Sequence, residues 1–363
     1  MAELENLPIR DDLKGQKPYG APQLHVPVSL NVNENTHRIP EAVAVDIIGR
    51  LAAAVLDINR YPDREFLGLR SALASYLGFD LEPQNIWAAN GSNEVLQQIM
   101  QAFGGPGRSA LGFTPTYSMY SLLAQGTGTV YLEGTRDARF ELTPESIREQ
   151  ILAARPNIVL LCSPNNPTGT PLSLACVIAA YEALTEATGG VLVVDEAYAE
   201  FGGQSEVSAI SLLSGRERLM ISRTMSKAFA FAGARVGYLA ADEAVVDALR
   251  LVRLPYHLSA FTQAAAEAAL DHADEMLATV ADIRLQRDRI VDELSKMNLD
   301  PYRSDANFVL FGGLDDSNAV FEALLEQGVL IRNVGIPGTL RVTAGTEAET
   351  TKFLQALRAT LGR

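Results

Sequence analysis

A single lysine, Lys227, lies among residues that could bind an anionic group. Thr224 and Ser226 place hydroxyl groups beside it, and Arg235 supplies a guanidinium group further along the chain. Gly237 allows a ligand to approach the backbone closely. A lysine in a confined site loses its proton more readily than one in water, and the free amine can attack a carbonyl group to form a Schiff base. A solvated lysine that follows a strand would give the same pattern.

Ser92 and Asn93 form a second candidate site, where an apolar segment meets a helical pattern. The first N–H groups of a helix and the Ser92 hydroxyl could hold a phosphate, although a helix cap is the more common role of such residues. The turn after the next apolar segment contains Tyr117 and Tyr120. Either ring could stack on a planar ligand, or only pack against a loop.

Two polar residues follow strongly apolar segments. Asn166 lies in the turn Ser163-Pro-Asn-Asn-Pro-Thr-Gly169, whose two prolines would hold its amide in a fixed position. Asp195 comes directly after Val191-Leu-Val-Val194, so its carboxylate needs a strong partner. A ring N–H⁺ would suit this carboxylate, and so would neighbouring backbone or an arginine.

The elements that must position these residues alternate between strand and helix over the middle of the chain. This alternation predicts a mostly parallel sheet, and ligands bind at the carboxyl ends of strands in such sheets. The expected strands are residues 86–89, 109–113, 128–132, 158–162, 191–194, 219–222 and 236–239. The expected helices are residues 40–56, 65–77, 91–103 and 173–188. Because the candidate residues follow strand ends, we expect them to share one site.

The chain is expected to divide into a large sheet domain and a smaller one. After about residue 242 the pattern changes to long helices, including one over 264–296 that is broken near its middle. Strands near 307–311, 329–332 and 340–343 and a terminal helix near 347–361 complete a smaller α+β domain. The expected division is an N-terminal arm at 1–30 that could reach a partner subunit, a first part of the small domain at 31–56, the large domain at 57–245 and the small C-terminal domain at 246–363.

Composition excludes several functional classes. The chain of 363 residues has 47% hydrophobic and 20% charged residues, and its net charge of −14 disfavours nucleic acid or an anionic membrane as a partner. We expect a cytoplasmic protein, because the first residues lack the regions of a secretion signal and no apolar run approaches a membrane span. The two cysteines, Cys162 and Cys176, and the four histidines do not have the spacing of a metal site.

Asn166, Asp195, Tyr198, Lys227 and Arg235, in this chain order, resemble the motif residues of the fold-type I pyridoxal phosphate-dependent aminotransferases. The resemblance covers nearly the whole chain and implies an α/β fold with a large, mostly parallel-sheet cofactor domain and a smaller α+β domain. It implies that Lys227 forms a Schiff base with pyridoxal 5'-phosphate and later moves the substrate proton. Asp195 would pair with the protonated pyridine nitrogen, where it keeps the ring an electron sink.

The same resemblance implies the remaining surroundings of the cofactor. Asn166 and Tyr198 would bind the ring hydroxyl, and Tyr117 would stack on the ring. The residues implied around the phosphate and ring are Ser92, Asn93, Thr224, Ser226 and Arg235.

Further motifs resemble the histidinol-phosphate aminotransferase branch of this family. They are Lys17-Pro-Tyr19, Leu30-Asn-Val-Asn-Glu-Asn35, Arg60-Tyr-Pro-Asp63, Asp305-Ala-Asn-Phe308, Ile331-Arg332 and Leu340-Arg-Val-Thr-Ala-Gly-Thr346. This branch exchanges an amino group between L-histidinol phosphate and 2-oxoglutarate in histidine biosynthesis. Thr36 departs from the branch, which usually has proline there, and the loop between Arg332 and Arg341 is short.

This closer resemblance also implies a homodimer and a set of substrate residues. Tyr61 would reach the cofactor phosphate of the partner subunit, and Arg341 would bind the amino acid carboxylate. Arg332 and Tyr19 would help to hold the substrate phosphate. The full set expected at the substrate is Tyr19, Asn33, Tyr120, Tyr256, Arg332 and Arg341.

Three other functions are compatible with these motifs. An aromatic amino acid aminotransferase needs a similar pocket, because imidazole and phenyl rings are alike in shape. A decarboxylase of threonine phosphate uses a similar scaffold. A non-catalytic ligand-binding module on this fold is the third alternative, against which the retained Lys227 argues.

Overall fold

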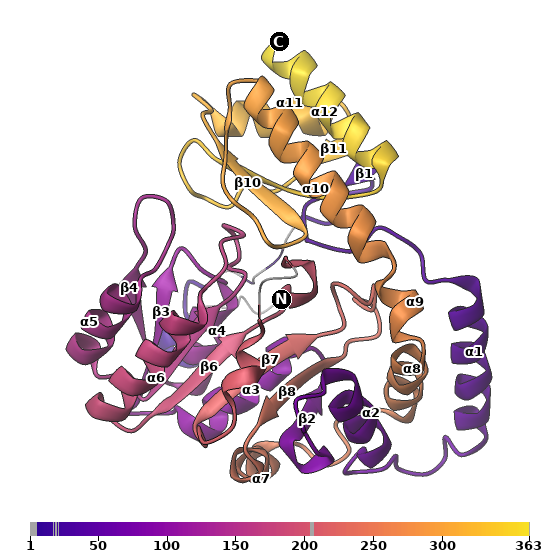
Figure 1. Cartoon of the computed structure of the whole chain (residues 1–363), viewed down its shortest axis with the longest axis vertical. Coiled ribbons are helices and arrows are strands. Elements are labelled where there is room, and N and C mark those ends of the chain that lie inside the picture. The colour runs from indigo at the N-terminus through magenta and orange to yellow at the C-terminus, as the bar shows by residue number, and fades with distance from the viewer. Residues whose placement is uncertain (1–5, 17, 19, 21, 204–206, 363) are drawn as a thin grey trace.

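A seven-stranded mixed sheet forms the centre of the computed structural model, which describes residues 6–16, 18, 20, 22–203 and 207–362 (Figure 1). Its strands, in the order β2-β8-β7-β6-β5-β3-β4, are β2 Ile86–Ala89, β8 Gly237–Ala241, β7 Leu219–Thr224, β6 Val191–Asp195, β5 Ile158–Cys162, β3 Ser109–Thr114 and β4 Val130–Thr135. β8 runs antiparallel to both of its neighbours, β2 and β7, whereas the pairs from β7 to β4 are parallel. The amino end of β8 therefore lies at the edge where the other strands have their carboxyl ends.

Helices cover the sheet so completely that every residue of β2, β5, β6, β7 and β8 is buried. This burial explains why the sequences of these strands are apolar at successive positions without alternation, except for the polar residues at the carboxyl ends of β6 and β7. The helices of this part are α2 Leu67–Leu77, α3 Ser92–Phe103, α4 Met119–Thr127, α5 Pro144–Ala154, α6 Leu174–Ala187 and α7 Glu243–Val252. Short 3-10 helices occur at Asp11–Leu13, Pro83–Asn85, Ala199–Phe201 and Ala209–Leu212.

A second, smaller sheet lies above the large one in Figure 1 and carries its own hydrophobic core. It is antiparallel, with β10 Phe308–Gly312 between β12 Leu340–Thr343 and β9 Asp300–Pro301. Its helices are α10 Thr279–Lys296, α11 Ser317–Glu326 and α12 Glu347–Leu361. The predicted fold class, a large mostly parallel sheet with a smaller α+β part, is confirmed.

The N-terminal segment joins the small part before the chain enters the large one. β1 Val28–Ser29 pairs in parallel with β11 Val329–Leu330. α1 Glu41–Leu56 then packs beside α8 Ala260–Asp271 at the outer side of the molecule (Figure 1). The helix expected over 264–296 is three helices, because α9 Ala273–Leu277 lies between α8 and α10.

The two hydrophobic cores meet within this broken helix. Met276 still belongs to the core of the large sheet, whereas Val280 belongs to the core of the small one. α7 and α8 pack on the large sheet, so the change of core falls later than residue 246. The division into domains at residues 31, 57 and 246 stays a prediction. Among the helices in the described ranges, none is long and apolar enough to cross a membrane.

Candidate active site

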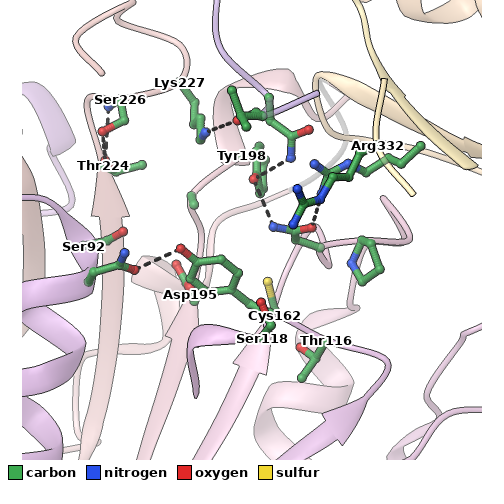
Figure 2. A pocket seen from close by; sticks show the side chains of 18 of the residues that line it. Ser92, Thr116, Ser118, Cys162, Asp195, Tyr198, Thr224, Ser226, Lys227 and Arg332 are labelled. Atoms are coloured by element: carbon green, nitrogen blue, oxygen red, sulfur yellow. Dashed lines mark hydrogen bonds between the residues drawn. The ribbon is translucent and has the colours of Figure 1, made fainter. Parts of the chain in front are cut away.

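A cavity of about 440 Å³ opens at the carboxyl edge of the large sheet, beneath the small one (Figure 2). Most of the residues expected at the site line it. From the expected cofactor set these are Ser92, Asn93, Tyr117, Asn166, Asp195, Tyr198, Thr224, Ser226, Lys227 and Arg235, and from the expected substrate set Asn33, Arg332 and Arg341.

One end of the cavity is built to bind an anion. Figure 2 shows Ser92, Thr224 and Ser226 together there, from the start of α3 and the end of β7. The Thr224 Oγ1 lies 3.0 Å from the Ser226 Oγ, and the Arg235 Nη1 lies 3.4 Å from the same Ser226 oxygen. Arg235 reaches this end because it comes just before the reversed strand β8. Hydroxyl groups, a guanidinium group and the first N–H groups of a helix can together bind a phosphate.

Two glycines permit the close packing of this anion-binding end. A Cβ atom on Gly237 would lie 2.1 Å from the Ser92 nitrogen, which is part of the backbone and cannot move aside. A Cβ atom on Gly91, whose φ is +86°, would lie 2.5 Å from the Arg235 Nη2. Both positions therefore require glycine for steric reasons.

Asp195 ends β6 on the floor of the cavity and is only 3% exposed. Its Oδ2 accepts a hydrogen bond of 2.8 Å from the Tyr120 hydroxyl, whereas its Oδ1 has no hydrogen-bond partner in the part of the chain that the structure describes. Burial raises the pKa of Asp195 to about 6, although the Tyr120 hydroxyl opposes the rise. A buried carboxylate with one unused oxygen suits a protonated ring nitrogen.

The Lys227 amine lies in the cavity and donates a hydrogen bond of 3.1 Å to the Val32 carbonyl. Burial, together with the positive charges of Arg341 and Arg235, lowers the pKa of this amine to about 8, although the Glu34 carboxylate opposes the fall. Roughly a tenth of a group with this pKa is unprotonated at pH 7. Lys227 can therefore act as a nucleophile and as a base.

The Tyr198 hydroxyl is held by two amides. It accepts hydrogen bonds from Asn33 Nδ2 at 2.9 Å and from Asn166 Nδ2 at 3.4 Å. Burial raises the pKa of Tyr198, so the hydroxyl keeps its proton and can donate it to an oxygen in the cavity.

Arg332 and Arg341 lie opposite each other in an isolated antiparallel bridge, with N···O distances of 2.9 and 2.8 Å. The short loop between them is thus a closed hairpin, and both guanidinium groups line the cavity. Arg341 is fixed by bonds of 2.6 Å to the Asn166 Oδ1 and 2.9 Å to the Asn31 carbonyl. Arg332 makes no side-chain hydrogen bond or ion pair among the residues in the described ranges. Figure 2 shows Arg332 on the side of the cavity away from Ser92 and Thr224.

Three of the expected site residues that the structure describes do not line this cavity. Tyr120 is 0% exposed and lies on the inward face of α4, a helix that the sequence pattern did not predict, so its expected contact with the substrate stays a prediction. Tyr61 and Tyr256 stack on each other, with ring centroids 4.4 Å apart, outside the cavity of their own chain. Tyr19 lies outside the described residues.

Several lining residues were not predicted. They are Asn31, Val32, Thr116, Ser118, Cys162, Pro167, Ala197, Asn333 and Val334. Cys162 pairs with Asp195 between β5 and β6, so the strand pattern could have placed it there. The contribution of Val32 is a backbone carbonyl, which no side-chain pattern reveals. Among the described side chains, no cluster of His, Cys, Asp or Glu could hold a metal ion.

Residues 26–357 match the family model described as aminotransferase class I and II. The chain is 62% identical over 361 residues to the histidinol-phosphate aminotransferase of Paenarthrobacter aurescens (strain TC1), which covers 99% of this chain and 97% of that protein. It is 55% identical to the histidinol-phosphate aminotransferase of Thermobifida fusca (strain YX), over 99% and 97% of the two chains. Among solved structures, that of histidinol-phosphate aminotransferase from Sinorhizobium meliloti in complex with pyridoxal-5'-phosphate is similar, with a TM-score of 0.84 and 27% identity over 93% and 91% of the two chains.

Proposed function

Because this chain belongs to the class I and II aminotransferases, we propose that it exchanges an amino group between L-histidinol phosphate and 2-oxoglutarate, with pyridoxal 5'-phosphate as cofactor. The reaction gives imidazole-acetol phosphate and L-glutamate, and it serves histidine biosynthesis. The observation that carries the proposal is a cavity with two separate anion-binding ends, Arg235 at one and Arg332 with Arg341 at the other. One end suits the phosphate of the cofactor, and the other suits the phosphate or carboxylate of the substrate.

The residues of the cavity fit pyridoxal phosphate. The unused Oδ1 of Asp195 is a buried acceptor for the ring N–H⁺, and Tyr198 and Asn166 offer donors to the ring hydroxyl. Ser92, Thr224, Ser226 and Arg235 would hold the phosphate. When bound, this cofactor supplies an electron sink for the bonding electrons released at the substrate α-carbon.

The side chains of the protein would carry out the proton transfers and orient the substrate. Asp195, ionised and buried, would hold the proton on the ring nitrogen. Lys227 would hold the cofactor through Nζ and, as an amine whose pKa is about 8, would take and return the substrate proton. Arg341, fixed by Asn166 and Asn31, presents its guanidinium fork to the glutamate carboxylate.

A half-reaction assay tests the proposed function. The cofactor-loaded protein is mixed with L-histidinol phosphate, L-phenylalanine or L-threonine phosphate, and the visible absorbance of the cofactor is followed. We expect the fastest change with histidinol phosphate and, after addition of 2-oxoglutarate, formation of glutamate. A preference for phenylalanine would instead identify an aromatic amino acid aminotransferase, and release of carbon dioxide without glutamate would identify a decarboxylase.

The role of Arg332 is tested by comparing two substrates that differ by one phosphate. Because the Arg332 guanidinium group lines the cavity and makes no hydrogen bond or ion pair with the residues that the structure describes, we expect Arg332→Ala to lower kcat/KM for histidinol phosphate by about 100-fold, the effect of losing a charge-assisted contact. The effect on L-histidinol, which has the same imidazole ring, should be small. Arg332→Lys keeps the charge and should restore part of the loss. Equal losses for both substrates would show that Arg332 does not bind the phosphate.

We also infer a homodimer and a cytoplasmic location. Tyr61 and Tyr256 support the dimer, since Tyr61 is 80% exposed and Tyr256 39% exposed, and neither of the two stacked rings lines the cavity of its own chain. A twofold partner would give Tyr61 a cofactor phosphate to bind. The cytoplasm is where biosynthetic substrates of this kind and the free cofactor are expected, and cell fractionation would test this location.

A further inference from the structure

We propose that Tyr120 is a positioning residue, which holds Asp195 so that one carboxylate oxygen faces the ring nitrogen of the cofactor. The inference deepens the proposed function and depends on pyridoxal phosphate being the cofactor. It gives Tyr120 a role different from the substrate contact expected from the sequence.

The packing of Tyr120 leaves its hydroxyl few directions. The side chain is 0% exposed within the core of the large sheet, and the Tyr117 ring meets it edge-on at 5.5 Å with an interplanar angle of 89°. A ring fixed in this way directs its hydroxyl at Oδ2 of Asp195, 2.8 Å away. With Oδ2 occupied, the carboxylate cannot turn without losing this bond, and Oδ1 remains available to the cavity.

The chemistry of the hydroxyl matters as much as its position. A neutral donor stabilises a carboxylate without cancelling its charge, so the charge remains available for the ring N–H⁺. An arginine at this place would neutralise Asp195 instead. The titratable groups that face Asp195 are Tyr120 from α4, Cys162 from β5 and the adjacent Glu196, whose carboxylate is paired with Arg223 at 2.8 Å.

Loss of the hydroxyl should move Asp195 toward its protonated form. Burial and the nearby Glu196 raise the pKa of Asp195, and the Tyr120 hydroxyl is the side-chain group that opposes them. Without this hydroxyl the pKa rises further, so a larger share of Asp195 is protonated near neutral pH. A protonated carboxyl group pairs poorly with a protonated ring nitrogen, and the cofactor should bind more weakly as the pH falls.

The test measures the affinity of cofactor-depleted protein for pyridoxal phosphate between pH 6 and 8.5 by fluorescence titration. For Tyr120→Phe we expect a Kd about tenfold higher at pH 7, because one hydrogen bond to a charged group is lost. At pH 6 the increase in Kd should be larger. In the loaded protein, kcat for histidinol phosphate should fall while KM changes little. Tyr238→Phe is the matched control, because Tyr238 is also buried but its hydroxyl makes no hydrogen bond to Asp195.

A double-mutant comparison separates positioning from general packing. If Tyr120 acts through the carboxylate, adding Tyr120→Phe to Asp195→Asn should change the Kd far less than it does in the parent protein. An unchanged Kd and pH dependence in Tyr120→Phe would overturn the inference, and so would an equal effect in the Asp195→Asn background. If the parent protein did not bind pyridoxal phosphate at all, the proposed cofactor itself would be wrong. If the parent protein and Tyr120→Phe bound it equally tightly, only the role of Tyr120 would be wrong, so the two failures can be told apart.

Discussion

Lys227 owes its chemistry to its surroundings. The chain places it in the turn after β7, where it lines the cavity together with three arginines, Arg235, Arg332 and Arg341. Burial is the largest cause of its lowered pKa, and Arg341 comes second. Both causes disfavour the charged ammonium form, so the free amine that a covalent tether and a base require becomes available close to neutral pH.

The pH dependence of Lys227 can be measured without cofactor. We expect its acylation by acetic anhydride, read by peptide mass spectrometry, to rise with pH and reach half of its maximum near pH 8, because only the unprotonated amine reacts. The exposed Lys296, labelled in the same sample, corrects for decay of the reagent. Arg341→Gln removes a positive charge and should move the midpoint upward. A midpoint above about 10, the value of an ordinary lysine, would contradict the lowered pKa.

The sequence predicted that these residues need polar partners better than it predicted which residues those hydrogen-bond partners are. A carboxylate after four apolar residues had to find a donor, so Asp195 was predictable as a site residue. That one donor is Tyr120 was not, because this bond joins residues 75 positions apart and depends on how α4 packs. Arg332 and Arg341 were predicted as a pair, but only the bridge between them shows why a short loop keeps them together.

At the scale of elements, the direction of β8 decides which of its ends contributes to the cavity. Because β8 runs against its neighbours, Arg235 just before its amino end lies at the same edge of the sheet as the carboxyl ends of the other strands. A strand pattern gives neither direction nor neighbours, so the sequence could predict a strand near 236–239 but not that it runs against β2 and β7. α4 was missed because its residues after Tyr117 were interpreted as a turn. α5 and α11 were not predicted either, and few of their residues are buried: Ile147 and Ile151 in α5 and Leu324 in α11.

The close contact between β8 and the start of α3 should be intolerant of a single methyl group. A Cβ atom at residue 237 would meet backbone atoms of Gly91 and Ser92 at 2.2 and 2.1 Å. We therefore expect Gly237→Ala to destabilise the protein by about 1–3 kcal/mol, as overpacking does, and to raise the Kd for pyridoxal phosphate by displacing Ser92. Thermal unfolding and fluorescence titration measure the two effects.

The control for this substitution is a glycine with free space around it. Gly49 lies within α1, and a Cβ atom there would meet nothing within 4 Å. Gly49→Ala should leave cofactor binding unchanged and stabilise the protein by about 0.5–1 kcal/mol, because alanine is the better helix former. If Gly237→Ala behaved in the same way as Gly49→Ala, the steric argument for the anion-binding end would be wrong.

At the scale of the whole molecule, a strap of residues 31–36 connects the two sheets across the cavity. It joins the small sheet through the Asn33 N–H, which donates to Thr343, and the large part through Asn35, which donates to the Ala228 carbonyl. The Lys227 amine donates to the same strap at Val32. The site therefore forms only when both parts of the chain and the strap are in place, which is why no single segment of sequence could reveal its shape.

Two features at the molecular surface extend this reasoning to two chains. Tyr61 is largely exposed and stacks on the partly exposed Tyr256, and the turn that carries Tyr61 is held by the side chains of Arg253 and Gln263. An exposed tyrosine on a well-anchored turn is suited to a defined contact with another molecule. If that molecule is a second copy of the chain, each cofactor site would combine Lys227 of one subunit with Tyr61 of the other.

Hybrid dimers test this shared site. Tyr61→Phe homodimers should keep about a tenth of the parent activity, since each site loses one hydrogen bond to the cofactor phosphate, and Lys227→Ala homodimers should be inactive. In a hybrid, the site that retains Lys227 receives an intact Tyr61 from the Lys227→Ala subunit. A mixture of equal amounts, after exchange of subunits, should therefore recover about a quarter of the parent activity, because about half of the dimers are hybrids with one native site each. Mixing Tyr61→Phe with the double variant Tyr61→Phe/Lys227→Ala provides no intact Tyr61, so this mixture should stay at about a twentieth of the parent activity. If both mixtures behaved alike, Tyr61 would not act in the site of the partner subunit.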